Sequence, residues 1–323
     1  MKLADIYNSL KQDLREVEQE LEKSIQTDHR DLNQSAVHLL EAGGKRMRPV
    51  FVLLSGKFGE YDVDKLKQVA VPLELIHMAT LVHDDVIDDA STRRGRPTVK
   101  AKWDNRVAMY TGDYILGRSL AIVSRIKDPE IHRVLSPAIY QMCRGEIEQI
   151  RDFFATDLSL VRYLHRIKRK TALLMSVSCE LGARVSGAAP DEVRRLRLYG
   201  YFVGMAFQIT DDILDLTGDE QILGKPAGSD LRQGNITLPV IYILKKGPEE
   251  DRERILQYLH NQGDEQALPE ILQQVRQSDG IPYAEDLARR YLDKALQVLE
   301  GLPAGETRES LRLIAEFVAG RSY

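Results

Sequence analysis

The stretch LVHDDVIDDA, residues 81–90, holds four aspartates next to apolar side chains: Asp84, Asp85, Asp88 and Asp89. Residues four apart share one face of a helix, so Asp84 is expected one turn before Asp88. Like charges at that spacing repel each other, and a bound cation reverses this effect. Carboxylates with room for water suit Mg²⁺, which proteins usually share with substrate phosphates. One such cluster alone is about equally well explained as a solvated acidic helix end.

A second cluster repeats the pattern much later in the chain. In FQITDDILDLTGD, residues 207–219, the carboxylates of Asp211, Asp212 and Asp215 again follow an apolar helical stretch. Two facing helices that each carry such carboxylates can direct them into one central pocket. Two D-D-x-x-D elements, each at the end of an apolar segment, are a specific signal. They favour a shared metal site over two unrelated solvated surfaces.

Basic side chains are available to balance these carboxylates, which do not converge without compensating positive charge. Arginine forks match phosphate oxygens, and lysine acts as a point charge. Acidic metal sites with separate basic groups describe a site for diphosphates bound with Mg²⁺, although each basic loop alone could be an exposed turn. The basic residues lie in four segments: Lys45, Arg46 and Arg48; Arg93, Arg94 and Arg96; Lys168, Arg169 and Lys170; and Lys225.

Helical periodicity runs through most of the chain and must position these residues. Apolar residues recur at steps of three and four from Leu3 to Ile25, opposite a face of charged and amide side chains. The same period returns in segments 69–89, 115–126, 134–154, 160–185, 193–216 and 255–299. Alternating β-type runs are nearly absent, and no Gly-rich phosphate loop follows a strand. The pattern predicts an all-α fold, a single domain over residues 1–323 that packs as a large helical bundle.

Composition excludes several classes of function. The formal net charge is −4, which does not indicate a nucleic-acid-binding protein. Cys143 and Cys179 are far apart and fit reduced thiols better than a disulfide framework. The sequence shows neither a signal-peptide pattern at the start nor a run of about 18 apolar residues. It therefore predicts a soluble, cytoplasmic protein with no stable membrane anchor.

The order and spacing of eight motifs identify a resemblance that covers nearly the whole chain. The motifs are GGKRMRP, LVHDDVIDD, RRGRPT, GDYILGRS, RGEIEQ, KTA, FQITDDILD and GKPAGSDLRQGNITLP. Together they resemble the trans-isoprenyl diphosphate synthases, or trans-prenyltransferases. The likeness is greatest to the catalytic subunits of bacterial heptaprenyl diphosphate synthases, which carry both aspartate motifs and work with a second, dissimilar subunit. The resemblance implies an all-α bundle around a central cavity. It also implies head-to-tail condensation of isopentenyl diphosphate with an allylic diphosphate such as farnesyl diphosphate.

The resemblance also assigns roles to particular residues. Asp84, Asp88 and Asp211 match the ligands of about three Mg²⁺ ions that arrive with the allylic diphosphate. Asp85, Asp212 and Asp215 match carboxylates that support those ligands. The catalytic set implied by the resemblance is Asp84, Asp85, Asp88, Lys170, Asp211 and Asp212. The residues matched to the allylic diphosphate are Arg93, Lys170 and Lys225. Those matched to isopentenyl diphosphate are Lys45, Arg48, His77 and Arg94, and those beside the reacting carbons are Thr171 and Gln208.

Physical chemistry agrees with these roles. Loss of diphosphate from an allylic carbon leaves a delocalised carbocation. Mg²⁺, lysine and arginine stabilise the charge that grows on the leaving group, and dry walls protect the cation from water. The departing diphosphate can accept the proton, so the reaction needs no His or Glu as base. His83 is therefore interpreted as a packing or supporting residue, and His77 could by itself be a packing histidine.

Two positions depart from the family pattern. Relatives often have lysine where this chain has Asn235, and lysine or asparagine where it has Ser229. One phosphate contact is therefore in question, and the group that compensates for Asn235 is not identified by the sequence.

Small side chains before the first cluster bear on product length. Helical rise places Ala79 roughly 7 to 8 Å below Asp84, with Thr80 beside it and Ile76 further down the same face. Short-chain relatives place a bulky aromatic residue at this position. Alanine predicts an open path and a long all-trans product, heptaprenyl diphosphate for quinone side chains. Ala79 could also be ordinary helix packing, and Met142 or Tyr140 of another helix could close the path instead.

Two other classes of function compete with this interpretation. A terpene cyclase or a synthase of another chain length would use the same fold, but cyclases seldom need the basic set of GGKRMRP and Arg94. A helical regulatory subunit that only binds a partner would be expected to have degraded aspartate motifs, and both motifs are intact. The family resemblance predicts a dimer, in particular a heteromer with a small non-homologous subunit.

Overall fold

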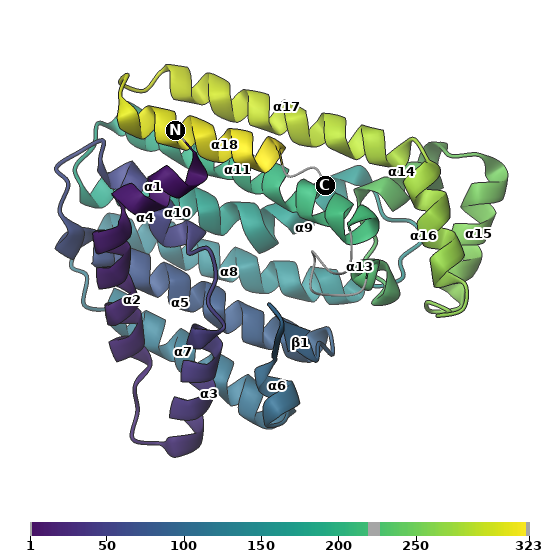
Figure 1. Cartoon of the computed structure of the whole chain (residues 1–323), viewed down its shortest axis with the longest axis horizontal. Coiled ribbons are helices and arrows are strands. Elements are labelled where there is room, and N and C mark those ends of the chain that lie inside the picture. Colours follow the sequence, from purple (N-terminus) through teal and green to yellow (C-terminus); the bar gives the residue numbers. More distant parts are fainter. Residues whose placement is uncertain (1, 219–226, 321–323) are drawn as a thin grey trace. The chain divides into compact units, whose positions relative to one another are not determined.

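The computed structural model describes residues 2–218 and 227–320. In these residues every regular element is a helix except one short hairpin, β1 (Thr92–Arg93) with β2 (Arg96–Pro97) (Figure 1). The predicted all-α fold is confirmed. No helix in the described part of the chain is long and apolar enough to cross a membrane.

The helices follow one another with short connections. The helices that begin before residue 130 are α1 (Leu3–Ser9), α2 (Lys11–Ile25), α3 (Arg30–Glu41), α4 (Met47–Gly56), α5 (Val63–Ile87), α6 (Val99–Lys102), α7 (Asn105–Val123) and α8 (Pro129–Arg151). The middle of the chain forms α9 (Leu160–Ile167), the π-helical turn η1 (Lys168–Ala172), α10 (Leu173–Val185), α11 (Pro190–Thr217) and α13 (Ser229–Arg232). The last helices are α14 (Leu238–Lys246), α15 (Glu249–His260), α16 (Leu268–Gln277), α17 (Gly280–Glu300) and α18 (Glu306–Ala319).

The chain divides into two compact units. Unit 1 comprises Met1–Ser136, Ser176–Arg197 and Leu299–Leu313, and unit 2 comprises Pro137–Met175, Leu198–Val298 and Ile314–Tyr323. The chain passes from one unit to the other within α8, α10, α11, α17 and α18. The single domain expected from the sequence stays a prediction.

Helix α5 is the central element of unit 1 and carries the first aspartate cluster. Asp62 caps its start by accepting a hydrogen bond from the backbone N–H of Asp64 at 2.9 Å. The helix is apolar on most sides because it packs against α2, α4 and α7. The carbonyl of Pro72, a proline inside the helix, accepts a hydrogen bond from Ser119 Oγ on α7 at 3.1 Å.

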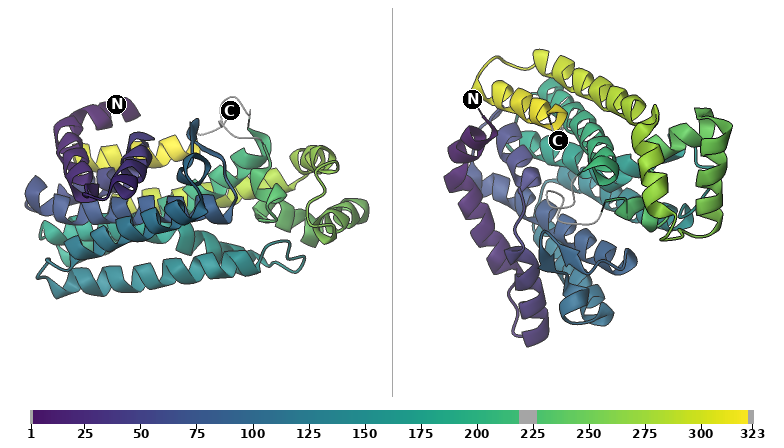
Figure 2. Two further views of the ribbon diagram at one scale, coloured as in Figure 1. Left: turned by 90° about the horizontal axis from the view of Figure 1, so that it is seen from below. Right: turned by 45° about the vertical axis from the view of Figure 1, so that its right-hand side comes forward.

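The first periodic segment, predicted as one helical face from Leu3 to Ile25, forms two helices. The chain breaks at Leu10, whose φ of −103° and ψ of 5° are not helical. Leu10, Val17 and Leu21 are nonetheless buried, so the predicted apolar face is kept. Helix α2 lies against α4 and α5 (purple in Figure 2).

Unit 2 has a core of apolar side chains from α9, α11 and the helices that follow. Tyr163, Ile209 and Tyr258 are among its fully or nearly fully buried members. The long periodic segment 255–299 proved to be three helices, because the chain turns at Gly263, whose φ is +81°, and again near Ser278. Helices α14, α15 and α16 contact one another and cover one side of this core (Figure 1).

Candidate active site

The first aspartate cluster occupies the C-terminal end of α5 in unit 1. Asp84 and Asp85 lie in the last turn and are 9% and 2% exposed. The helix ends at Ile87, Asp88 is its C-cap, and Asp89 has a left-handed φ of 52°. Asp84 and Asp85 are therefore helical, whereas Asp88 and Asp89 lie just beyond the last helical residue. The negative end of the helix dipole adds to these charges, so the site attracts a cation.

Asp85 is held by an arginine of the β-hairpin. Its Oδ1 accepts a hydrogen bond from Nε of Arg93 at 2.8 Å and lies 2.7 Å from Nη2 of the same side chain. Burial raises the pKa of Asp85, and the Arg93 guanidinium opposes this shift. Lys100 pairs with the exposed Asp89 on the same side of the cluster. Positive charge thus already surrounds the aspartates, as their convergence requires.

His83 belongs to the packing around this cluster. Its Nε2 lies 3.2 Å from a carboxylate oxygen of Asp113 on α7. A Cβ at Gly112 would lie only 2.3 Å from that nitrogen, so the glycine makes room for the ring. This arrangement agrees with the packing role predicted for His83.

Three of the residues matched to isopentenyl diphosphate come together in unit 1. Arg48 at the start of α4 is 9% exposed, and its Nε is buried without a hydrogen-bond partner among the described residues. Burial lowers the pKa of Arg48 to about 10, and Arg94 acts in the same direction. The pKa of His77 is lowered well below its ordinary value by burial and by the guanidinium charges of Arg48 and Arg94. His77 is therefore neutral at pH 7 and can donate one N–H to a phosphate oxygen.

Glycine brings the GGKRMRP loop close to the hairpin. A Cβ at Gly44 would lie 2.4 Å from Nη1 of Arg94, and the φ of 143° at this position favours glycine. Arg94 and Gly95 form the hairpin turn with φ values of 53° and 73°, the left-handed pair that a tight two-residue turn uses. Lys45 lies in the same loop, directly after Gly44, and is exposed.

The second aspartate cluster lies on α11 in unit 2. Asp212 is 4% and Asp215 is 1% exposed, whereas Asp211 is half-buried. Asp212 accepts hydrogen bonds from the Tyr163 hydroxyl at 2.7 Å and from Gln208 Nε2 at 2.8 Å. Asp215 accepts hydrogen bonds from Ser229 Oγ at 2.8 Å and from the backbone N–H of Asp230 at 3.0 Å.

The environment of Asp212 disfavours its charged form. Burial raises the pKa of Asp212 to about 6, although the hydrogen bonds from Tyr163 and Gln208 and the charge of Arg166 oppose the shift. The same burial raises the pKa of the Tyr163 hydroxyl well above its ordinary value. A cation near this cluster would restore the charged form of the carboxylate.

A π-helical turn positions Lys170 and Thr171 beside α11. Such turns carry an extra residue and often occur at functional sites. Lys170 Nζ donates to Gln149 Oε1 at 3.1 Å, and Thr171 Oγ1 donates to Gln208 Oε1 at 2.5 Å. Helix α11 comes close because residue 204 is glycine: a Cβ there would lie 2.5 Å from Cα of Ala172. Thr171, Gln208 and Asp212 thus form one hydrogen-bonded chain.

Sequence reasoning missed several residues of these networks. Gln149 lies in the RGEIEQ motif, so the resemblance offered a signal for it. Tyr163 and Glu74 carry no such signal, since a buried tyrosine or glutamate on a helix is not distinguished by spacing.

The two departures from the family pattern also have a structural setting. Ser229 is the partner of Asp215 described above. Asn235 Oδ1 is buried without a hydrogen-bond partner among the described residues. Close to it in the chain, the carbonyl of Ile236 accepts a hydrogen bond at 2.5 Å from Arg166, a buried cation. Lys225, matched to the allylic diphosphate, lies outside the described residues.

The residues predicted to set chain length lie inside unit 1. Ala79 and Ile76 are 1% and 2% exposed, and the hydroxyl of Thr80 donates to the His77 carbonyl at 2.8 Å. Of the two alternative floor residues, Met142 is buried but Tyr140 is 64% exposed. An exposed tyrosine does not form an internal floor in this chain, so Met142 and the α5 face remain as the two candidates.

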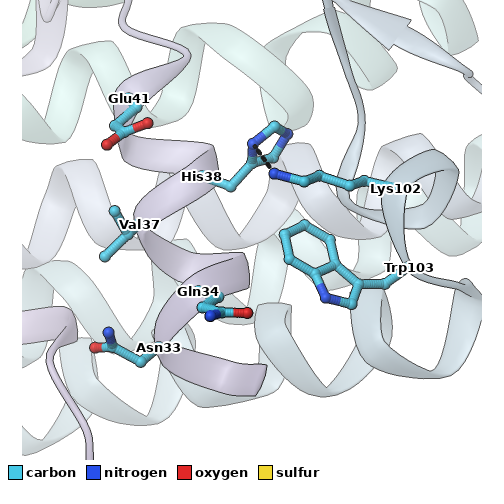
Figure 3. Close-up of a pocket in the computed structure, with 7 residues that line it drawn as sticks. All are labelled: Asn33, Gln34, Val37, His38, Glu41, Lys102 and Trp103. Carbon is cyan, nitrogen blue, oxygen red and sulfur yellow. Dashed lines mark hydrogen bonds between the residues drawn. The ribbon is translucent and has the colours of Figure 1, made fainter. Parts of the chain in front are cut away.

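A separate hollow on unit 1, of about 480 Å³, contains none of the predicted site residues. Figure 3 shows its lining from α3 and from the end of α6. Lys102 Nζ lies 3.4 Å from Nδ1 of His38 and 4.8 Å from the centre of the Trp103 ring. The hollow is therefore lined by side chains that already contact one another.

The carboxylates of each cluster are chemically suited to a divalent cation that also binds phosphate oxygens. In the described residues no group of three or more His, Cys, Asp or Glu side chains is placed to hold a metal alone. Mg²⁺ keeps several waters and is usually bound by one or two carboxylates together with phosphate oxygens. The Asp84–Asp88 pair of unit 1 fits this description, and the half-buried Asp211 of unit 2 fits it separately.

Comparison with known proteins places the chain in a family. The family model described as polyprenyl synthetase matches residues 29–275. Component 2 of the heptaprenyl diphosphate synthase from Geobacillus stearothermophilus is 53% identical over 100% of both chains. The crystal structure of heptaprenyl diphosphate synthase from Staphylococcus aureus has a TM-score of 0.92, with 42% identity over 97% of this chain and 98% of that one. The polyprenyl synthase of Caulobacter crescentus, complexed with calcium and isoprenyl diphosphate, has a TM-score of 0.94, with 30% identity over 99% of this chain and 98% of that one. This chain belongs to the polyprenyl synthetase family.

Proposed function

We propose that this prenyltransferase condenses isopentenyl diphosphate head-to-tail with an allylic diphosphate, farnesyl diphosphate being the expected primer, to make all-trans heptaprenyl diphosphate for quinone side chains. The observation that carries the proposal is the pair of aspartate clusters, each at the end of an apolar helical stretch and each supported by buried hydrogen bonds. The high identity to a heptaprenyl diphosphate synthase component supports the chain length.

Divalent metal use is typical of this family, and a relative is complexed with calcium and isoprenyl diphosphate. We propose that Mg²⁺, about three ions, is the metal here and that it neutralises the charge developing on the leaving diphosphate. Asp84, Asp88 and Asp211 would hold it. Asp85 and Asp212 would support these ligands, because both are buried and hydrogen-bonded to other side chains.

The basic residues divide into two substrate sets. Arg93 of unit 1 and Lys170 of unit 2, with Lys225, would bind the allylic diphosphate. Lys45, Arg48, His77 and Arg94 would bind isopentenyl diphosphate, and the electrostatic proximity of Arg48, His77 and Arg94 supports this set. Separate sets are needed because the two diphosphates must be held in fixed orientations while the new carbon–carbon bond forms.

Thr171 and Gln208 would lie beside the reacting carbons. Their mutual hydrogen bond satisfies polar groups that would otherwise face the carbocation. The proton lost after bond formation goes to the departing diphosphate, and the neutral state of His77 agrees with a binding role and not an acid role.

We further propose that the chain works with a partner, a small non-homologous subunit. The Geobacillus stearothermophilus relative is named component 2 of its enzyme. Helix α7 exposes Tyr110, Leu120 and Met109 to 68%, 46% and 40%. Large apolar side chains gathered on one helix are typical of a protein contact surface. A non-catalytic partner protein is the alternative function, and the intact, internally supported aspartate clusters argue against it.

A product assay tests the proposed function. The purified chain, with any subunit that co-purifies, is incubated with Mg²⁺, farnesyl diphosphate and labelled isopentenyl diphosphate, and the product is separated by chromatography. A heptaprenyl chain is the expected result. A cyclic terpene, or a protein that binds both diphosphates in the presence of its partner yet forms no product, would contradict the proposal.

A further inference from the structure

The loop between α3 and α4, which carries Lys45 and leads into Arg48 at the start of α4, has an unusual backbone conformation. Gly43, Gly44 and Arg46 have φ values of 70°, 143° and 46°. Glycine adopts such values freely, but an arginine in the left-handed region persists only where its surroundings hold it. The contacts of Arg46 therefore decide the course of this loop.

The Arg46 side chain is bound entirely by protein groups. Its Nε donates to Glu18 Oε1 of α2 at 2.5 Å, and its Nη1 lies 3.3 Å from Glu74 Oε1 of α5. The carbonyls of Gly43 and Leu40 accept further hydrogen bonds from it at 3.3 and 3.2 Å. The side chain is only 9% exposed. Arg46 thus differs from Arg48, whose Nε has no hydrogen-bond partner among the described residues.

Glu74 is the buried end of this arrangement. It is 3% exposed, and its second oxygen, Oε2, has no hydrogen-bond partner among the described residues. It lies one helical turn before His77 on α5. Its charge acts on Arg46 and also on Arg48 and Arg94. A buried carboxylate among guanidinium groups offsets the repulsion between their positive charges.

A second contact holds the loop from α1. The Tyr7 hydroxyl donates to the Lys45 carbonyl at 2.6 Å, and it lies 3.1 Å from Sδ of Met47. The two N-terminal helices therefore contact two consecutive residues of the loop: Tyr7 of α1 bonds the Lys45 carbonyl, and Glu18 of α2 bonds the Arg46 side chain. The polyprenyl synthetase match begins at residue 29, after both helices.

We propose that α1 and α2 position the isopentenyl diphosphate loop through Tyr7 and Glu18, with Arg46 as the link between Glu18 and Glu74. These four are positioning residues and would not touch substrate. The inference rests on the proposed function, because it concerns the loop assigned to isopentenyl diphosphate.

The chain offers matched controls for the two contacts. Glu16 of α2 also reaches α5, where its Oε2 lies 3.2 Å from Lys67 Nζ, but it does not contact the loop. Tyr61 also donates its hydroxyl to a protein oxygen, the Asp13 carboxylate of α2, whereas Tyr7 donates to the Lys45 backbone carbonyl. Glu18→Ala is therefore compared with Glu16→Ala, and Tyr7→Phe with Tyr61→Phe. Alanine is the best helix former, so neither glutamate change should break α2.

The experiment measures KM for isopentenyl diphosphate, KM for farnesyl diphosphate and kcat on the full chain with any co-purifying subunit. Calorimetric binding of isopentenyl diphosphate gives a readout that does not depend on turnover. Glu18→Ala and Tyr7→Phe should each raise the dissociation constant and KM for isopentenyl diphosphate about 3- to 10-fold, and the double variant more, as expected for loss of one or two modest contacts. The KM for farnesyl diphosphate and both control variants should stay within about twofold of the wild type.

Two outcomes would overturn the positioning role. One is a double variant whose isopentenyl diphosphate binding matches the wild type. The other is an equal rise in both KM values with a lower Tm, since that describes a general loss of structure. Failure of the proposed function would look different, because the wild-type protein itself would then bind no isopentenyl diphosphate and extend no primer.

Discussion

Asp85 and Arg93 form a two-pronged ion pair between α5 and the β-hairpin, with Oδ1 of Asp85 at 2.8 Å from Nε and 2.7 Å from Nη2 of Arg93. Asp85 is 2% exposed, so this buried pair attaches the first aspartate cluster to the hairpin. Arg93 has two roles in this account: it satisfies a buried carboxylate and it is proposed to bind the allylic diphosphate.

Replacing Arg93 should therefore affect both stability and substrate binding. Arg93→Gln leaves a buried carboxylate without its cation, so the free energy of unfolding should fall by about 1–3 kcal/mol. The KM for the allylic diphosphate should rise more than that for isopentenyl diphosphate. Arg96 is the control. It lies opposite Arg93 in the register of the hairpin, but its side chain is half-exposed and makes a longer ion pair, 3.7 Å from Glu41. Urea unfolding measures the change. An equal decrease in the free energy of unfolding for Arg93→Gln and Arg96→Gln would refute the role of the ion pair.

Asp212 should make stability depend on pH in the absence of Mg²⁺. Its folded-state pKa of about 6 lies above the ordinary value of 3.8, so the folded state favours the protonated carboxyl. This stabilisation is fully present below about pH 4 and is lost as the pH rises through about 6, a change of roughly 2–3 kcal/mol. Unfolding of wild type and Asp212→Asn is compared in EDTA from pH 4 to 7.5. The stability difference between them should shift in favour of the variant as pH rises, and a constant difference would contradict the assignment.

Ala79 should set the length of the product. Ala79→Phe places an aromatic ring roughly 7 to 8 Å below Asp84, so the product should become shorter while primer binding is kept. Met78 is the neighbouring buried side chain and points to another face of α5, so Met78→Phe is the control for added bulk. Chromatography of the two products decides the matter. An unchanged chain length with Ala79→Phe, in a folded protein, would remove Ala79 from the path of the growing chain.

The exposed apolar residues of α7 should contact another subunit. Tyr110→Lys places a charge on a side chain that is 68% exposed in the chain by itself. A monomer, or loss of the co-purifying subunit, is expected in sedimentation experiments. Val161 is a control because it is 61% exposed on α9. If Val161→Lys and Tyr110→Lys have the same effect on assembly, α7 has no special role.

The sequence predicted the parts of the fold and site that depend on local periodicity. The i, i+4 spacing of Asp84 and Asp88 and the apolar segments before both clusters placed the aspartates at helix ends, and the structure has them there. Asp88 and Asp89 lie just beyond the last helical residue, Ile87, and nothing in a run of similar residues fixes that point. The segment 255–299 was divided by turns that its periodicity did not reveal.

The parts that depend on tertiary contacts could not be predicted. Arg46 looked equivalent to Lys45 and Arg48 in the sequence, yet two glutamates from other helices bind it. The hydrogen bond from Tyr163 to Asp212 joins residues 49 positions apart. The π-helical turn at Lys168–Ala172 follows from packing against α11 at Gly204, which leaves no local sequence signal. The roles of these residues in substrate binding stay predictions.

The central claim is that aspartates from both clusters bind one allylic diphosphate through shared Mg²⁺. The most direct measurement is calorimetric binding of an unreactive farnesyl thiodiphosphate, with and without Mg²⁺, to the wild type, Asp84→Asn and Asp211→Asn. The account predicts Mg²⁺-dependent binding that either single change weakens by two or more orders of magnitude, while the variants keep the wild-type fold. Wild-type affinity in either variant would contradict the account, because that cluster would then take no part in binding the allylic diphosphate.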